Sequence, residues 1–144
     1  MAGTPRTDTE QLMELLSQSL SAYYGEFTIA AASENLTASQ GKVLTVLRRG
    51  PAAMRCLAST LTCDASNMTG IIDRLEKRAL VRREPSASDR RVKNVALTAE
   101  GERVTDAIRA KMHATRDGLD RLSDEERDSL HALLERVFIT PPAS

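Results

Sequence analysis

The residues best suited to specific hydrogen bonding lie between positions 64 and 97. A helical segment rich in small polar residues comes first, and two short segments of strand character follow at 80–85 and 92–97. The tip between the strands is basic, with the run Asp89-Arg90-Arg91. A helix of this size fits the major groove of duplex DNA, and an arginine-bearing hairpin fits the neighbouring minor groove. The combination predicts a protein that binds double-stranded DNA.

The segment from Asp64 to about Arg78 has the pattern of an amphipathic helix packed on a core. Asp64 is a good N-cap. The apolar residues that repeat at helical spacing, and are expected to be buried, are Met68, Ile71, Ile72 and Leu75. The residues left on the outer face are Ser66, Asn67, Gly70, Asp73, Arg74 and Lys77. A short helix over 53–61 and a turn at 62–63 precede this segment, as in a helix-turn-helix.

Capping motifs mark the other helices expected along the chain. Boxes occur at Thr7-x-x-Glu10, Thr37-x-x-Gln40 and Ser123-x-x-Glu126, and Thr98 is a further N-cap. Helices are therefore expected over residues 7–32, 37–49, 53–61, 64–78, 98–119 and 123–137. The predicted fold class is mainly α, a winged helix-turn-helix with six helices plus a β-hairpin wing.

The outer helical regions, 1–35 and 98–144, have long apolar faces and flank a small middle region, 36–97. A unit that small cannot cover three such faces by itself. A closed twofold dimer would bury them, and it is the commonest symmetric assembly. We therefore expect an intertwined homodimer, with dimerisation through the outer regions and DNA binding through residues 36–97. Two recognition helices in one dimer suit a pseudo-palindromic site.

Charge is unevenly distributed along the chain, although the formal net charge is zero. Residues 1–41 carry one basic and five acidic side chains, a net −4. Residues 42–93 carry twelve basic and five acidic side chains, a net +7, and residues 94–144 carry seven and ten, a net −3. A basic middle between acidic ends indicates one positive face. DNA is the partner class that this distribution favours.

Composition and motifs argue against a membrane protein and against an enzyme. No run approaches the roughly 18 apolar residues of a membrane span. The polar start, 1–7, lacks a secretory signal, so a cytoplasmic location is expected. There is no G-x-S-x-G, no H-E-x-x-H and no glycine-rich phosphate loop, so we expect no catalysis and no cofactor. His113 and His131 lack neighbours at metal-ligand spacing, so no metal is expected.

Taken in order, four motifs resemble those of the MarR family of bacterial winged-helix regulators. The first two are Leu36-Thr37-Ala38-Ser39-Gln40, similar to the family's L-T-x-x-Q, and Leu57-Ala58 with Ser66-Asn67-Met68-Thr69, similar to its L-A…S-x-x-T. The third is Arg74-Leu75-Glu76-Lys77-Arg78-Ala79-Leu80-Val81, similar to R-L-E-x-x-G-L-V. The last is Asp89-Arg90-Arg91 with Leu97-Thr98-Ala99-Glu100-Gly101, similar to the wing signature D-x-R and its L-T-x-x-G.

This resemblance implies a homodimeric transcription factor, usually a repressor of nearby genes. It also implies a small aromatic or phenolic effector that binds between the dimerisation helices and the DNA-binding lobe and releases DNA. The resemblance does not show whether an effector exists, which molecule it is, or which residues bind it. It also leaves open the operator, the regulated genes, and whether the protein represses or activates them.

The resemblance also assigns roles to matching positions. Ser66, Asn67 and Gly70 would meet base edges, while Thr69 and Arg74 would contact phosphates. Arg90 and Arg91 would occupy the wing tip, with Asp89 holding the loop in shape. The chain departs from the family at Ala79, where glycine is usual. A left-handed backbone costs a non-glycine residue roughly 1 kcal/mol there.

Two alternatives remain beside the DNA-binding interpretation. Cys56 and Cys63 could form a redox switch, but peroxide-sensing relatives place their cysteine in the first helix, which has none here. Buried or unreactive thiols are the expectation. A winged-helix module that binds only protein is the other alternative, and the basic middle argues against it. Tyr23, Tyr24 and Phe27 are equally suited to a ligand lid and to plain core.

Overall fold

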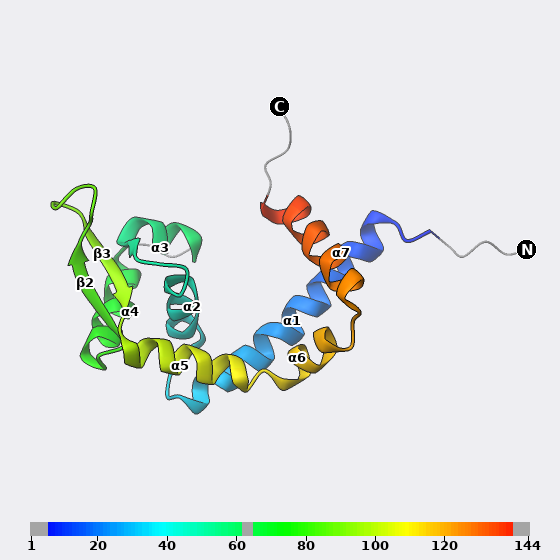
Figure 1. Ribbon diagram of the computed structural model, residues 1–144, viewed down its shortest axis with the longest axis horizontal. Coiled ribbons are helices and arrows are strands. Elements are labelled where there is room, and N and C mark those ends of the chain that lie inside the picture. The colour runs from blue at the N-terminus through cyan, green and yellow to red at the C-terminus, as the bar shows by residue number, and fades with distance from the viewer. Residues whose placement is uncertain (1–5, 62–64, 140–144) are drawn as a thin grey trace, which may run out of the picture. The chain divides into compact units, whose positions relative to one another are not determined.

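The computed structural model describes residues 6–61 and 65–139. The chain divides into two compact units, Met1–Lys111 and Met112–Ser144. The first contains the helices α1 Thr9–Ser33, α2 Ala38–Leu47, α3 Met54–Thr60, α4 Ala65–Lys77 and α5 Ala99–Ala110, and the strands β1 Ala52–Ala53, β2 Val81–Pro85 and β3 Lys93–Leu97 (Figure 1). The second contains α6 His113–Asp120, α7 Asp124–Leu134 and a π-helical turn, η1 Glu135–Ile139. The winged-helix fold class is confirmed.

The helix starts follow the capping motifs, with one correction. The boxes at Thr37–Gln40 and Ser123–Glu126 form as predicted, and the Thr98 hydroxyl accepts the Gly101 N–H. At α1 the prediction of Thr7 with Glu10 is wrong, because the box is formed by Asp8 and Gln11. A carboxylate is a stronger N-cap than a threonine hydroxyl and interacts favourably with the positive end of the helix dipole.

The core of the first unit lies where α2, α3, α4 and α5 meet the sheet. The predicted buried face of α4 is confirmed, since Met68, Ile72 and Leu75 are fully enclosed and Ile71 nearly so. Leu44, Leu57, Val95, Val104 and Ile108 complete the same core. Each such side chain contributes about 1.5–3 kcal/mol on burial. The core thus holds α4 by one face and leaves its other face outside.

The hairpin forms as predicted, within one residue at each strand start. β2 pairs antiparallel with β3, from Val81 opposite Leu97 to Pro85 opposite Lys93. A strand that the sequence did not reveal, β1, adds to the other edge of β3 and gives the order β1-β3-β2. Two alanines carry no alternating pattern, so only the tertiary contact identifies β1.

Two helix ends adopt the same left-handed cap. Asn35 after α1 and Ala79 after α4 both have φ of 57°. Leu36 N–H bonds Ala31 O at 3.0 Å, and Leu80 N–H bonds Leu75 O at 3.0 Å, the long bond of a Schellman motif in each case. Ala79 therefore takes the strained conformation that the family usually gives to glycine, and the helix exit keeps its geometry despite the substitution.

The single helix predicted over 98–119 is wrong. α5 ends at Ala110, and Met112, with ψ of 62°, separates it from α6. Neither glycine nor proline marks this break in the sequence. At the end of α5 the Lys111 side chain instead binds α1, donating to Ser33 Oγ at 2.8 Å and to Glu34 Oε1 at 3.0 Å. The helix ends at this long-range contact.

The second unit exposes most of its apolar side chains. Neither α6 nor α7 contains a buried residue. The exposed large apolar residues of this unit are Leu119, Leu133, Leu134, Val137, Phe138 and Ile139. In the first unit, α1 likewise exposes Leu12, Met13, Leu15 and Leu20. Among the described residues, no helix has the length and hydropathy needed to cross a bilayer.

Candidate nucleic-acid interface

The basic residues of the middle region fall into two groups, those with partners inside the chain and those without. Four arginines are held internally: Arg48 pairs with Asp106, Arg82 with Glu84, Arg83 with Asp73 and Glu76, and Arg78 with backbone carbonyls. The sequence treats all of them as equivalent surface cations. The structure shows that each of these four side chains already has a partner inside the chain.

Arg83 on β2 is the most firmly held of the four. Its Nη2 lies 2.7 Å from Asp73 Oδ1, and its Nη1 lies 2.7 Å from Glu76 Oε1. The hydrogen bond that Arg83 donates to Asp73, followed by the charge of Glu76, raises the Arg83 pKa above its usual value despite partial burial. The pairs fasten the hairpin to α4. They also neutralise two carboxylates on α4 that would otherwise repel phosphate.

Arg82 has a comparable role across the hairpin. Its Nη1 donates to Leu97 O at 2.8 Å, and its Nε donates to Glu84 Oε2 at 3.2 Å. Both partners belong to the two paired strands, so the guanidinium braces the base of the wing. Arg82 and Arg83 therefore support the interface from inside the chain.

A second group of cations is exposed and has no ion pair or side-chain hydrogen bond to any other described residue. In and around α4 and the wing this group comprises Arg74, Lys77, Arg90, Arg91 and Lys93, and Arg49 and Arg55 lie near β1 and α3. Three of them, Arg74, Arg90 and Arg91, are positions that sequence motifs singled out. The motifs assign no role to the other four, Lys77, Lys93, Arg49 and Arg55. Only the pattern of internal pairing distinguishes them.

The outer face of α4 presents most of the predicted contact positions. Asn67, Thr69 and Arg74 are exposed, and Gly70 is partly exposed. Ser66 belongs to α4, but its side chain lies outside what the structure describes, as does the predicted N-cap Asp64. The spacing 67, 70, 74 places these residues along one side of the helix.

Nothing in the described structure requires a glycine at position 70. A Cβ built there meets nothing within 4 Å, and its backbone does not have a positive φ. A glycine inside a helix nevertheless costs about 1 kcal/mol relative to alanine. An outside group that approaches the α4 backbone closely would account for this residue.

The wing tip is closed by its own polar groups. Asp89 Oδ1 accepts the Arg91 N–H at 3.0 Å, and Asp89 O accepts the Val92 N–H at 3.0 Å. Ser86 N–H donates to Val92 O at 2.8 Å, which closes the loop at its base. An aspartate that bonds the backbone two residues on is a common turn device. This geometry supports the wing-supporting role predicted for Asp89, and it leaves the Arg90 and Arg91 side chains exposed.

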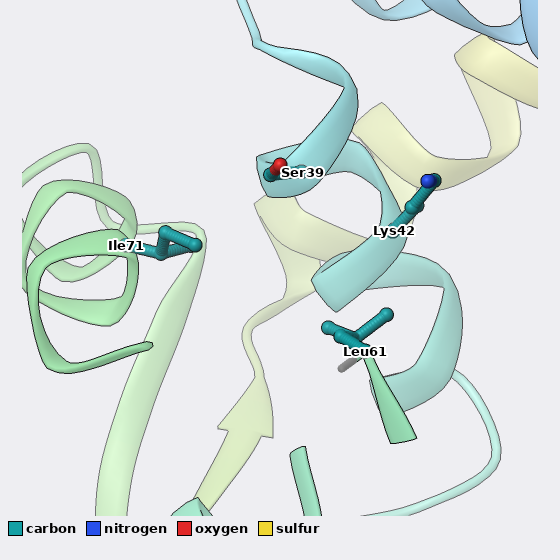
Figure 2. A pocket seen from close by; sticks show the side chains of 4 residues that line it. All are labelled: Ser39, Lys42, Leu61 and Ile71. Carbon is teal, nitrogen blue, oxygen red and sulfur yellow. The ribbon is translucent and has the colours of Figure 1, made fainter. Parts of the chain in front are cut away.

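A small recess lies beside α2 and α4. Figure 2 shows a recess lined by Ser39, Lys42, Leu61 and Ile71, which encloses about 40 Å³. Such a space holds roughly three water molecules, whereas small-molecule sites measure about 300–1,000 Å³. Lys42 also lies over the Tyr24 ring, 4.3 Å from its centroid. Phe27 is core, while Tyr23 and Tyr24 remain partly exposed.

The residues weighed for redox or metal chemistry are dispersed. Cys56 is exposed, so of the two expected states, buried or unreactive, burial does not apply to this thiol; Cys63 lies outside the described residues. His131 lies 3.6 Å from Glu135, its neighbour on the next helical turn. The part of the chain that the structure describes contains no group of three His, Cys, Asp or Glu residues placed to hold a metal ion.

Comparison with known proteins identifies relatives over the same region. The sequence model of the MarR family matches residues 36–93. The HTH-type transcriptional repressor NicR of Pseudomonas putida is 34% identical over 106 residues, which are 73% of this chain and 67% of NicR. The HTH-type transcriptional regulator PecS of Dickeya dadantii is 35% identical over 107 residues, 71% of this chain and 64% of PecS. The chain thus spans about two thirds of the length of these curated relatives.

A solved structure matches over almost the whole chain. CouR from Rhodococcus jostii, crystallised with p-coumaroyl-CoA, has a TM-score of 0.74 and 27% identity over 94% of this chain and 97% of its own. The family match, residues 36–93, runs from the residue before the α2 capping box to the first residue of β3. It therefore contains α4, β2 and the wing tip, and it ends at the start of β3. The chain belongs to the MarR family of transcriptional regulators.

Proposed function

We propose that this protein binds duplex DNA as a homodimer, with α4 in the major groove and the β2–β3 wing in the minor groove, and thereby represses transcription. The observation that carries the proposal is the separation of cations described above. The side chains of Arg74, Arg90 and Arg91 have no partner among the described residues, while those of Arg82 and Arg83, on the wing hairpin, are bound inside the chain. Unpaired arginines on one helix and one loop tip are suited to phosphates and grooves.

Each proposed contact has a chemical role. The DNA-binding set comprises Ser66, Asn67, Thr69, Gly70, Arg74, Arg90 and Arg91, with Asp89 supporting the wing. Side chains at the start of a recognition helix are placed for base edges, and Arg74, further along α4, is placed for phosphate. Arginine suits the negative potential of a narrow minor groove. The function needs no catalytic step, and binding DNA places the protein in the cytoplasm of a bacterial cell.

Dimerisation is proposed from the apolar surface that the single chain leaves exposed. Leu15 and Leu20 on α1 are 59% and 50% exposed, and Val137 and Ile139 at the other end of the chain are 62% and 73% exposed. A soluble monomer rarely exposes so many large apolar residues along neighbouring helical turns. A second copy of the chain would cover them and would place two α4 helices on successive turns of DNA.

Regulation by a small molecule is part of the proposal. CouR is known with p-coumaroyl-CoA bound, and the acyl group of that molecule is phenolic. We infer an aromatic or phenolic effector for this chain, bound between the dimerisation helices and the DNA-binding region. Its effect on DNA would follow from different affinities for DNA-compatible and DNA-incompatible forms.

A gel-shift comparison tests the proposal. Wild-type protein and the variant Arg90→Ala/Arg91→Ala are titrated onto a duplex selected from a random pool by the wild type. The variant is expected to bind about a hundredfold or more weakly, because a dimer loses four groove contacts. The control Arg116→Ala/Arg121→Ala removes the same charge from exposed positions, one in α6 and one at its C-cap, and should bind as wild type does. Failure of wild type to bind any duplex would favour the protein-interaction alternative.

A further inference from the structure

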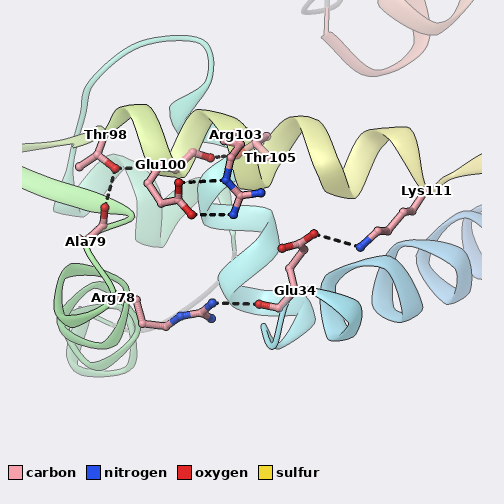
Figure 3. A network of polar contacts seen from close by, with 9 residues as sticks. Glu34, Arg78, Ala79, Thr98, Glu100, Arg103, Thr105 and Lys111 are labelled. Carbon is pink, nitrogen blue, oxygen red and sulfur yellow. Dashed lines mark hydrogen bonds and ion pairs between the residues drawn. The ribbon is translucent and has the colours of Figure 1, made fainter.

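Two basic side chains from distant parts of the sequence bind the C-terminal end of α1. α1 ends at Ser33, and the Schellman turn through Asn35 leaves the carbonyls of Glu34 and Asn35 outside the helical hydrogen-bond pattern. The negative end of the helix dipole lies here. Two basic side chains reach this end from positions more than 40 residues away, Arg78 and Lys111. Figure 3 shows both approaching from different elements.

Arg78 binds the two carbonyls as a fork. Its Nη1 donates to Asn35 O at 2.8 Å, and its Nη2 donates to Glu34 O at 3.0 Å. The planar guanidinium suits two adjacent acceptors, whereas a lysine ammonium would act as a single point charge. Arg78 directly follows the last residue of α4, and its own N–H bonds back to Arg74 O at 3.3 Å. The contact therefore joins the exit of α4 to the end of α1.

The other side of the same exit is held by α5. Thr98, the N-cap of α5, donates its hydroxyl to Ala79 O at 2.6 Å and its N–H to Leu80 O at 3.1 Å. A Cβ at Gly101 would lie 2.0 Å from Leu80 O, so glycine is required for this approach. Residues 78–80 are thus bound by α1 on one side and by α5 on the other.

From this arrangement we propose that Arg78 is a positioning residue for DNA recognition, which sets the orientation of α4 relative to α1. The inference rests on the proposed DNA-binding function. α1 is a proposed dimerisation helix, so its orientation relative to α4 determines how the two α4 helices of a dimer are spaced. Each Nη atom of Arg78 gives one of its two N–H donors to a carbonyl at the end of α1, so the side chain is held in place from inside the chain.

Two readouts distinguish positioning from direct contact. The first is a set of selected duplexes in which the separation of half-sites is changed by one and by two base pairs. The second is the dependence of affinity on salt, which reports the number of phosphates contacted. Both are measured for full-length wild type, Arg78→Ala, Arg78→Lys and Lys77→Ala, with dichroism to establish folding. Lys77 is the neighbouring cation without an internal partner, so Lys77→Ala is the matched control.

For Arg78→Ala we expect binding to the preferred duplex to weaken about tenfold, as for loss of charged hydrogen bonds. Its discrimination among half-site separations should flatten, while its salt slope stays that of wild type. Arg78→Lys, which keeps the charge but loses the fork, should be intermediate in discrimination. Lys77→Ala should keep the wild-type preference for separation, whatever its effect on overall affinity.

Two outcomes would overturn the inference and leave the proposed function standing. In the first, Arg78→Ala lowers the salt slope by about 0.9 for each protomer's lost contact, which identifies Arg78 as a phosphate ligand. In the second, Arg78→Lys, or a folded Arg78→Ala, keeps the full wild-type preference for separation. Failure of wild type to bind any duplex has a different meaning, because it removes the proposed function itself.

Discussion

Two parts of the molecule differ in the kind of side chain that they leave exposed: α4 and the wing on one hand, and α1, α7 and η1 on the other. On α4 and the wing these side chains are charged, Arg74, Arg90 and Arg91, above a core that is otherwise satisfied. On α1, α7 and η1 they are apolar side chains, such as Leu15 and Phe138. Unpaired charges suit a polyanion, and exposed apolar surface suits another protein surface. The two kinds of surface therefore suit the two proposed partners, DNA and a second copy of the chain.

Charged substitutions on the apolar face of α1 should have the largest effect, because they should disrupt the proposed dimer directly. The variant Leu15→Asp/Leu20→Asp is expected to be monomeric, because charges would replace apolar contacts in the dimer. Its DNA affinity should fall about 10²–10⁴-fold, since the second half-site no longer binds in the same complex. Sedimentation equilibrium and gel shift, each at low and high salt, measure the two effects. The control Gln18→Asp/Ser21→Asp, on another side of α1, should remain dimeric, and a monomeric wild type would break the comparison.

Substitution of Gly101 tests the close contact between α5 and the residues that follow α4. Gly101→Ala places a methyl group against Leu80 O, where the built distance is 2.0 Å. Moving backbone at this site should destabilise the fold by about 3 kcal/mol or more. Urea unfolding followed by dichroism measures the loss. A Gly101→Ala variant with wild-type stability would show that the contact between α5 and residues 79–80 is loose.

Gly70 is expected to separate fold stability from DNA binding. Gly70→Ala should stabilise α4 by up to about 1 kcal/mol, because alanine is the better helix former and the added Cβ meets no neighbour. DNA affinity should nevertheless fall about tenfold if a groove edge approaches this backbone closely. The control Gly118→Ala in α6 should also stabilise its helix without affecting DNA. Unchanged affinity of Gly70→Ala would remove glycine from the interface.

The smallest expected effect concerns the two left-handed caps. Ala79→Gly should raise the free energy of unfolding by roughly 1 kcal/mol, because glycine adopts a φ of 57° without steric cost. Asn35→Gly, at the same φ, should change stability less, because asparagine tolerates this region. Parallel thermal unfolding of the two variants measures the difference. Equal effects would mean that Ala79 is not strained.

Local patterns predicted the elements that depend on near neighbours. The buried face of α4, the hairpin and the boxes at Thr37 and Ser123 each require only residues a few positions apart, and each was confirmed. The box at α1 was missed by one residue, because Thr7 and Asp8 both fit the motif and only the better acceptor is used. β1 and the break after α5 were missed, because both depend on contacts with distant segments.

The predicted contact set at the interface came from motif positions and remains a proposal. The structure supports this proposal by showing which arginine side chains have partners inside the chain and which do not. The motif resemblance gives a role to Arg74 and none to Arg78, but nothing in the local pattern indicates that Arg78 binds α1, since both arginines lie at the end of one amphipathic helix. Arg78 is bound to α1, and the side chain of Arg74 has no partner among the described residues.

The sequence by itself determined the segregation of charge, the capped starts of α2, α5 and α7, the wing and the membership in a family. These follow from side-chain type and spacing over one or two turns of chain. Tertiary structure alone decided which cations serve the fold, where residue 101 must be glycine, and where α5 ends. The reason is that each of those outcomes depends on atoms brought together from segments far apart in the chain, which no local pattern encodes.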